Sequence, residues 1–472
     1  MMGCRCTRTN RPGQPDLGLS VYLTWVLLSA GLVLAPPPSA LAQASRPDDE
    51  LAEARRLTQE AATLYSSGKF PEAIPLVQRA LAIQEKTLGP EHADVGASLD
   101  ALAGLYRAQG QYRDAERLYR RALAIREKTL GRANPALALS LNNLAGLYRA
   151  QGKYAEAEPL YRRALVIEEE SRGPEALVVA PSLDNLAGLY RAQGKYAQAE
   201  PLYRRALAIE EKWRGPEEPE VAASLNNLAG LYHAQGRYAE AEPLYRRALA
   251  IGERALGPEH PSIAANLNNL ALLYAAQGKS AESEPLQRRA LAIQEKAVGP
   301  EHPDVATSLN NLAELERAQG KYAQAEPRYQ RALAIREKAL GLEHPAVAGS
   351  LTGLAELYQA QGEYAQAEPR YRRALAIIEK ALGPEHPDVA TVLDSLAGLY
   401  EAQGKYLQAE PRYRRALAIL EKALGPEHPD VAPVLENFAG FLRKTNRAAV
   451  AQDMEARARI IRAKRAEIAP AK

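Results

Sequence analysis

Apolar residues along most of this chain follow the spacing of paired amphipathic helices. In residues 387–428, a first stretch places Val389, Leu393 and Leu396 at offsets of 0, 4 and 7, which is the spacing of one helical face. A second stretch, from Tyr406 onward, repeats a one-faced pattern. A glycine-containing break separates the two stretches and another follows them. This alternation predicts a helix hairpin.

The hairpin pattern recurs every 42 residues without insertion or deletion. The glycine of the central turn suits a left-handed helix cap, and Asn446 takes the next slot after the last of these glycines. Two such helices cannot bury their apolar stripes alone, whereas stacked hairpins bury them continuously. We therefore predict an all-α fold, an α-solenoid of about ten stacked helix-turn-helix units. The turn glycines are Gly68, Gly110, Gly152, Gly194, Gly236, Gly278, Gly320, Gly362 and Gly404.

The first 44 residues differ in composition from the repeats. Several arginines precede an apolar run from Val21 to Ala35, and small residues suited to cleavage after Ala42 or Ala44 follow it. This order is typical of a secretory signal peptide, and the run is shorter than the roughly 20 residues that span a membrane. We predict export to the periplasm or outside the cell, with no stable membrane insertion after cleavage. The alternative is a protein anchored by an uncleaved N-terminal segment.

Changes in composition divide the chain into four parts. The last part becomes polar and strongly basic, as expected of a terminal repeat with a solvated outer face. The parts are a signal peptide (1–44), a short polar lead (45–50), the repeat array (51–446) and a C-terminal capping helix with a tail (447–472).

Charge and cysteine content exclude several classes of function. Lys and Arg number 60 and Asp and Glu number 57, a net charge of +3. This balance gives no general reason to expect nucleic acid or an anionic membrane as a partner. Both cysteines, Cys4 and Cys6, precede the repeats, so packing alone must hold the array together.

The repeat consensus resembles a known family. The pattern L-x2-L-A-G-L-Y…G-x-Y…A-x3-Y-x2-A-L is similar to the tetratricopeptide repeat (TPR), and the 42-residue period, the SLNNLAGLYRAQGKY core and the GPEHPDVA connector resemble its kinesin light chain variety. The resemblance covers roughly residues 50–462. The chain departs from the common form at Leu309, where Trp is usual, and in longer second helices that end at glycines such as Gly383. The resemblance implies a right-handed superhelix whose first helices line a concave groove for peptide segments.

No residue pattern indicates catalysis, a metal site or a cofactor, so we predict that the chain is not an enzyme. Most of the histidines lie in connectors, one repeat apart, which is too far to share a zinc ion with ligands at about 2 Å. We expect a turn or capping role for them. The histidines in question are His92, His260, His302, His344, His386 and His428.

Paired asparagines in the first helices give the sharpest candidate site. Asn is a poor residue inside a helix because its amide competes with the backbone, so its recurrence indicates a partner for that amide. One hypothesis is a structural ladder between neighbouring helices, and the other is a grip on the backbone of an extended peptide, as the family resemblance implies. Both can hold for different members of a pair. The candidate residues are Asn142, Asn143, Asn185, Asn226, Asn227, Asn268, Asn269, Asn310 and Asn311.

Two further positions of the first helix bear on binding. A glycine such as Gly188 recurs in mid-helix, where it costs up to about 1 kcal/mol against Ala; a close ligand or neighbouring helix would explain it, and so would duplication of a tolerated residue. Three residues later the chain carries Arg107, Arg149, Arg191 and Arg317 among more varied residues. We expect the groove to be basic in its N-terminal half and more acidic toward its C-terminal half, and the row of Arg107, Arg149 and Arg191 to hold acidic residues of a partner.

These observations favour an exported scaffold that binds a protein or peptide segment. The alternatives are a structural or self-assembling envelope spacer, and a sensor or adaptor subunit of a larger complex. The sequence leaves the partner and the oligomeric state open.

Overall fold

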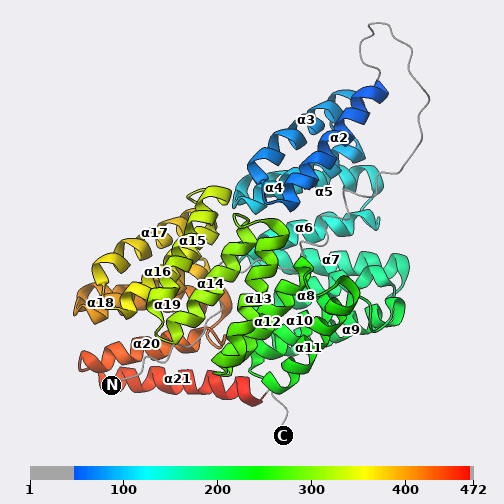
Figure 1. Ribbon diagram of the computed structural model, residues 1–472. Coiled ribbons are helices and arrows are strands. Elements are labelled where there is room, and N and C mark those ends of the chain that lie inside the picture. The colour runs from blue at the N-terminus through cyan, green and yellow to red at the C-terminus, as the bar shows by residue number, and fades with distance from the viewer. Residues whose placement is uncertain (1–46, 468–472) are drawn as a thin grey trace. The chain divides into compact units, whose positions relative to one another are not determined.

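The computed structural model describes residues 47–467 (Figure 1). The expected signal peptide (1–44) and residues 468–472 of the tail lie outside the described residues. The described chain forms two compact units. The N-terminal unit holds residues 47–148 and 155–174, and the C-terminal unit holds residues 149–154 and 175–467.

Helices in consecutive antiparallel pairs make up both units, which confirms the predicted all-α solenoid. The N-terminal unit contains α2 (Pro47–Ser66), α3 (Phe70–Leu88), α4 (Ala93–Ala108), α5 (Tyr112–Leu130) and most of α6 (Ala136–Ala150) and α7 (Tyr154–Arg172). The C-terminal unit begins with a 3₁₀ turn (Leu177–Val179), α8 (Ala180–Ala192), α9 (Tyr196–Arg214), α10 (Val221–Gln235), α11 (Tyr238–Leu256), α12 (Pro261–Ala276) and α13 (Ser280–Val298). It continues with α14 (Pro303–Ala318), α15 (Tyr322–Leu340), α16 (Pro345–Ala360), α17 (Tyr364–Leu382), α18 (Pro387–Ala402), α19 (Tyr406–Leu424), α20 (Val431–Lys444) and α21 (Ala448–Glu467).

The turn inside each hairpin requires a backbone conformation that favours glycine. Gly236, for example, caps α10 with φ 78° and ψ 7°, a left-handed geometry, and glycine adopts it without a Cβ clash. Asn446 takes the same slot in the last hairpin with φ 61°; Asn is among the few other residues that tolerate this region. The predicted caps are therefore confirmed.

The connector histidines act as helix caps, as predicted. In α14, the Nδ1 atom of His302 accepts a hydrogen bond from the backbone N–H of Asp304 at 3.2 Å, and Pro303 occupies the first helical position. The other five connector histidines make the same bond. Within residues 47–467, no three His, Cys, Asp or Glu side chains gather in a way suited to a metal ion.

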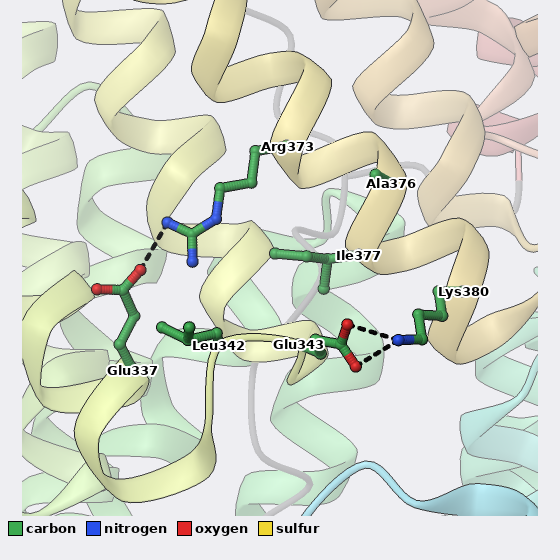
Figure 2. A pocket seen from close by; sticks show the side chains of 7 residues that line it. All are labelled: Glu337, Leu342, Glu343, Arg373, Ala376, Ile377 and Lys380. Atoms are coloured by element: carbon green, nitrogen blue, oxygen red, sulfur yellow. Dashed lines mark hydrogen bonds and ion pairs between the residues drawn. The ribbon is translucent and has the colours of Figure 1, made fainter.

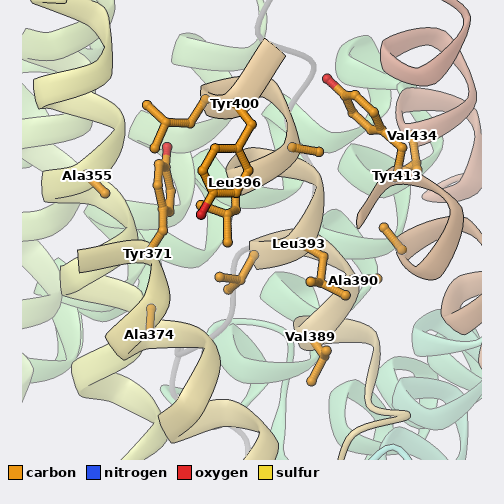
Figure 3. Packing of buried hydrophobic residues seen from close by; sticks show 14 of the residues in the cluster. Ala355, Tyr371, Ala374, Val389, Ala390, Leu393, Leu396, Tyr400, Tyr413 and Val434 are labelled. Atoms are coloured by element: carbon orange, nitrogen blue, oxygen red, sulfur yellow. The ribbon is translucent and has the colours of Figure 1, made fainter. Parts of the chain in front are cut away.

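Tyrosines, leucines and alanines fill the space between the helices. Tyr371 and Tyr400 are fully buried, as are Leu396 and Ala374 (Figure 3). One continuous apolar cluster extends from Ala313 on α14 to Ile461 on α21. A solenoid core of this kind makes each hairpin depend on its neighbours.

Ion pairs join successive second helices on their exposed sides. Arg373 of α17 pairs with Glu337 of α15 at 2.6 Å, and Arg415 of α19 pairs with Glu379 of α17 at 2.6 Å. Equivalent pairs recur from repeat to repeat in both units. Because these pairs are partly solvated, each contributes at most about 1 kcal/mol.

Helix formation starts slightly earlier than the repeat array that the sequence marks at residue 51. Helix α2 begins at Pro47, so part of the expected polar lead (45–50) forms its first turn. Asp48, Asp49 and Glu50 lie in that turn, where carboxylates interact favourably with the helix dipole. At the other end, α21 buries Ala451 and Ala458 while most of its remaining side chains are exposed or half-exposed.

Candidate binding face

The first helices of the C-terminal unit present one half-exposed side, which we name the first-helix face. It consists of positions 185, 188 and 191 of α8 and of the equivalent positions in the later first helices, α10, α12, α14, α16 and α18, which follow at intervals of 42 residues. Arg149 at the end of α6 belongs to it as well. Asn185 and Arg191 are half-buried, whereas Leu183 and Leu186 on the opposite side of α8 are buried. Helical periodicity thus separates the face from the core.

Side chains hydrogen-bond between neighbouring first helices and form what we call the inter-repeat ladder. The Nδ2 atom of Asn268 donates to Ser308 Oγ at 2.9 Å, and Ser308 donates to Oε1 of Gln294 at 2.6 Å. One repeat later, Asn310 donates to Ser350 Oγ at 2.9 Å. These bonds explain why Asn persists inside the helices, since its amide has a partner there.

The second asparagine of a pair reaches back to the preceding repeat. Asn227 donates to Oδ2 of Asp184 at 2.9 Å, and Asn269 donates to Oδ1 of Asn226 at 3.4 Å. Asn226 in turn donates to Oδ1 of Asn266 at 2.7 Å. In these repeats both members of the pair therefore take part in the structural ladder, one of the two hypotheses raised by the sequence.

The remaining candidate asparagines lie at the equivalent positions. Asn142 is 8% exposed, while Asn143, Asn185 and Asn311 are half-buried. Arg107 is half-buried on α4 of the N-terminal unit. A ligand-binding role for these five residues stays a prediction.

Arginines of one repeat cover the mid-helix glycines of the next. A Cβ atom added to Gly188 would lie 2.7 Å from Nη1 of Arg149, and one added to Gly230 would lie 2.6 Å from Nη1 of Arg191. Real side chains do not approach so closely, so the glycines make room for the guanidinium groups. Close approach of a neighbouring side chain therefore accounts for Gly188 and Gly230.

Arg317, at the equivalent position of a later repeat, is surrounded by carboxylates. Its guanidinium lies 2.8 Å from Glu314 and 3.3 Å from Glu356, and its side chain is 10% exposed. Glu401 is similarly engaged, with Lys444 at 2.7 Å. The acidic end of the first-helix face thus neutralises its own charges.

Buried carboxyl groups of the ladder escaped the sequence reasoning. Burial raises the pKa of Asp184 to about 7, and the nearby carboxyl of Glu210 adds to the rise. Ser224 Oγ lies within hydrogen-bond distance of both carboxyls, at 3.3 Å from Asp184 and 2.9 Å from Glu210. The available signal was Asp at a position where several other repeats carry Asn. Burial likewise raises the pKa of Asp394 to about 7.

A shallow pocket lies on the exposed side of the second helices (Figure 2). Leu342, which takes the place of the connector proline, lines it and is 61% exposed. The ion pairs Arg373–Glu337 and Lys380–Glu343 border it at 2.6 and 2.5 Å. Because equivalent ion pairs recur along the array, this pocket carries no distinct chemistry and is the weaker candidate.

Solved structures similar to this chain are built from the same kind of repeat. A Podosopora anserina kinesin light chain-like protein of nearly identical TPR-like repeats is 34% identical, with 42% of this chain and 94% of that chain covered and a TM-score of 0.37. BtubC (BKLC) from P. vanneervenii is 28% identical, with coverages of 50% and 92% and a TM-score of 0.39. A Rap protein complexed with Competence and Sporulation Factor is 17% identical, with coverages of 79% and 98% and a TM-score of 0.52, a likeness of fold alone.

Three further findings concern curated proteins, membrane-spanning helices and the repeat family. Curated proteins gave no match. No helix between residues 47 and 467 combines the length and apolar character needed to cross a membrane. The sequence profile of the tetratricopeptide repeat matches residues 50–128, 136–212, 220–296, 262–338, 346–422 and 392–463. Together with the stacked hairpins and their glycine caps, this match over most of the length shows that the chain belongs to the tetratricopeptide repeat family.

Proposed function

We propose that this chain is an exported scaffold that binds an acidic segment of a partner protein on its first-helix face. The tetratricopeptide repeat fold is typical of protein–protein interaction and indicates no enzymatic family. The N-terminal sequence motivates the export part of the proposal, since an arginine-rich start, a short apolar run and small residues follow one another there.

The observation that carries the binding proposal is the placement of Arg149 and Arg191. Each guanidinium extends over a glycine of the next first helix, and both arginine side chains are half-exposed. Many ladder asparagines, in contrast, already use their amides between repeats. Arginine on a half-exposed face is suited to bidentate contact with carboxylates.

Charge reversal of the arginine row tests this proposal. The double variant Arg149→Glu, Arg191→Glu should bind the partner at least about tenfold more weakly. The loss should be larger at low salt, because screening weakens exposed charges. Partner segments crosslinked to the wild-type chain in an envelope fraction should map to the first-helix face. Crosslinks confined to the second helices, or equal affinity of the double variant, would contradict the proposal.

Two further measurements separate the alternatives. N-terminal sequencing of the protein from cells should begin after residue 42 or 44, whereas an intact N-terminus would refute cleavage. Light scattering over a range of concentrations should show constant mass. Mass that grows with concentration would favour a self-assembling spacer instead.

A further inference from the structure

The step between neighbouring repeats sets the spacing of charges that the arginine row can bind. The Arg149 guanidinium extends over α8 at Gly188, and the Arg191 guanidinium extends over α10 at Gly230. Helices α8 and α10 approach within 8 Å between Cα atoms, and packed helices lie about 8–10 Å apart. The two guanidinium groups therefore repeat at roughly the helix-packing distance.

Extended peptides offer few spacings that match this step. In a β-strand, side chains on one face recur every second residue, at about 6.7 Å, or every fourth, at about 13 Å. A polyproline II segment has three residues per turn and rises about 3.1 Å per residue, so residues i and i+3 share one side at about 9.3 Å. Only the three-residue period places side chains at about the distance between first helices.

Each of these arginines lies beside a tyrosine hydroxyl. Tyr203 Oη is 3.4 Å from the position of a Cβ on Gly188, and Tyr245 Oη is 3.5 Å from that on Gly230. Because Tyr245 is only 3% exposed, its hydroxyl lies in the core beside the guanidinium, and a carboxylate above Arg191 would meet the guanidinium, which can donate hydrogen bonds. Within the described residues, Arg191 forms no ion pair with a carboxylate of its own chain, in contrast to Arg317.

We propose that the partner segment is an extended, polyproline II-like stretch whose carboxylates recur at residues i and i+3, one over Arg149 and one over Arg191. This inference rests on the proposed function and adds to it the register of the partner, which is the spacing of the acidic residues along its chain. The partner class is an acidic protein segment with this three-residue period.

Synthetic peptides of one composition test the register. Three fluorescein-labelled proline- and alanine-rich peptides carry two glutamates that are two, three or four residues apart, so that their net charge is equal. Fluorescence anisotropy with the full chain should show that the three-residue spacing binds about tenfold more tightly than the other two. Arg191→Gln, which copies Gln359 at the same position of a later repeat, should reduce the preferred peptide to the level of the others.

Two further variants separate the contact at Arg191 from a general effect of charge. Gly230→Ala retains every charge but places a Cβ 2.6 Å from the Arg191 guanidinium, so it should also weaken binding of the preferred peptide. Arg415→Gln removes one charge from the second-helix ion pair with Glu379 and should leave binding unchanged.

The outcomes distinguish the two proposals. Equal affinity for all three spacings, with loss of binding in the double Arg→Glu variant, would overturn the register and leave the proposed function standing. Absence of binding by every acidic peptide, or binding unaffected by the double variant, would overturn both.

Discussion

The inter-repeat ladder changes character within the C-terminal unit. Between α12 and α14, the contact of Asn268, Gln294 and Ser308 is polar and hydrogen-bonded. Between α16 and α18, the equivalent residues are Thr352, Ile378 and Val392, and the last two are fully buried in the apolar cluster. The same backbone geometry therefore accepts a hydrogen-bonded set of residues or a largely apolar one, in which the hydroxyl of Thr352 is buried without a hydrogen-bond partner.

This difference shows what the ladder requires. A buried donor without a partner costs about 1–3 kcal/mol, whereas replacing both partners by apolar groups can be nearly neutral. The last of these contacts, between α18 and α20, combines apolar and polar residues. Val434 replaces the serine there and Asp394 keeps a bond only from Asn437, at 2.7 Å. Variants that break the contact between one pair of neighbouring first helices, or convert it from polar to apolar, test this requirement.

The largest effect on stability should come from breaking one hydrogen-bonded contact between neighbouring first helices. Ser308→Val removes the acceptor of Asn268 and the donor to Gln294, so it should destabilise the array by about 2–3 kcal/mol in urea unfolding. The matched triple change Asn268→Thr, Gln294→Ile, Ser308→Val copies the set of the α16–α18 step and should recover most of the loss. A neutral Ser308→Val would show that the ladder contributes nothing to stability.

A smaller effect should come from the acidic ladder residue Asp184. Its pKa is about 7 in the folded chain and about 4 in an unfolded one. The folded state therefore holds a proton between these values that the unfolded state releases, and stability falls as pH rises from about 4 to 7. Asp184→Asn, which copies Asn226, should be more stable by about 1–2 kcal/mol at pH 8 and indistinguishable near pH 4.

Thermal unfolding across this pH range checks the Asp184 prediction. Asp453→Asn on exposed α21 serves as a control and should not change the pH profile. A pH profile of Asp184→Asn parallel to that of the wild type would refute the assigned titration.

The smallest effect should distinguish two mid-helix glycines. No atom lies within 4 Å of a Cβ built on Gly440 in α20, whereas the Arg149 guanidinium lies 2.7 Å from one built on Gly188. Gly440→Ala should stabilise the array by about 0.5–1 kcal/mol, since Ala favours helix. Gly188→Ala should gain less than this or lose stability, because the guanidinium must move. Equal melting shifts for both variants would contradict the packing explanation.

Periodicity made the fold predictable from the sequence. The 42-residue interval of the turn glycines, with Asn446 in their last slot, fixed the hairpins, and the helix caps at positions such as His302 followed from connector chemistry. Repetition supplies the same signal many times, so local ambiguity averages out.

The candidate site was harder to predict, because one helix position can face a neighbour or a ligand. Asn268 and Arg191 recur with the same period, yet the first bonds Ser308 and the second extends over Gly230. Sequence distance alone does not reveal which residue 40 or 43 positions away completes a contact. The pairing of Asp184 with Glu210 through Ser224 was hidden for the same reason.

The ladder hydrogen bonds, each of which joins one repeat to the next, also bear on how the array can change in length. Asn226 and Asn268 occupy equivalent positions in consecutive repeats, and each donates a hydrogen bond to the residue 40 positions onward. Loss of the 42 residues 227–268 would leave Asn226 opposite Ser308, a pairing the chain already contains. Gene rearrangements that remove or add whole repeats in this region would therefore keep a partner for the Asn226 amide, so the ladder makes these repeats interchangeable modules.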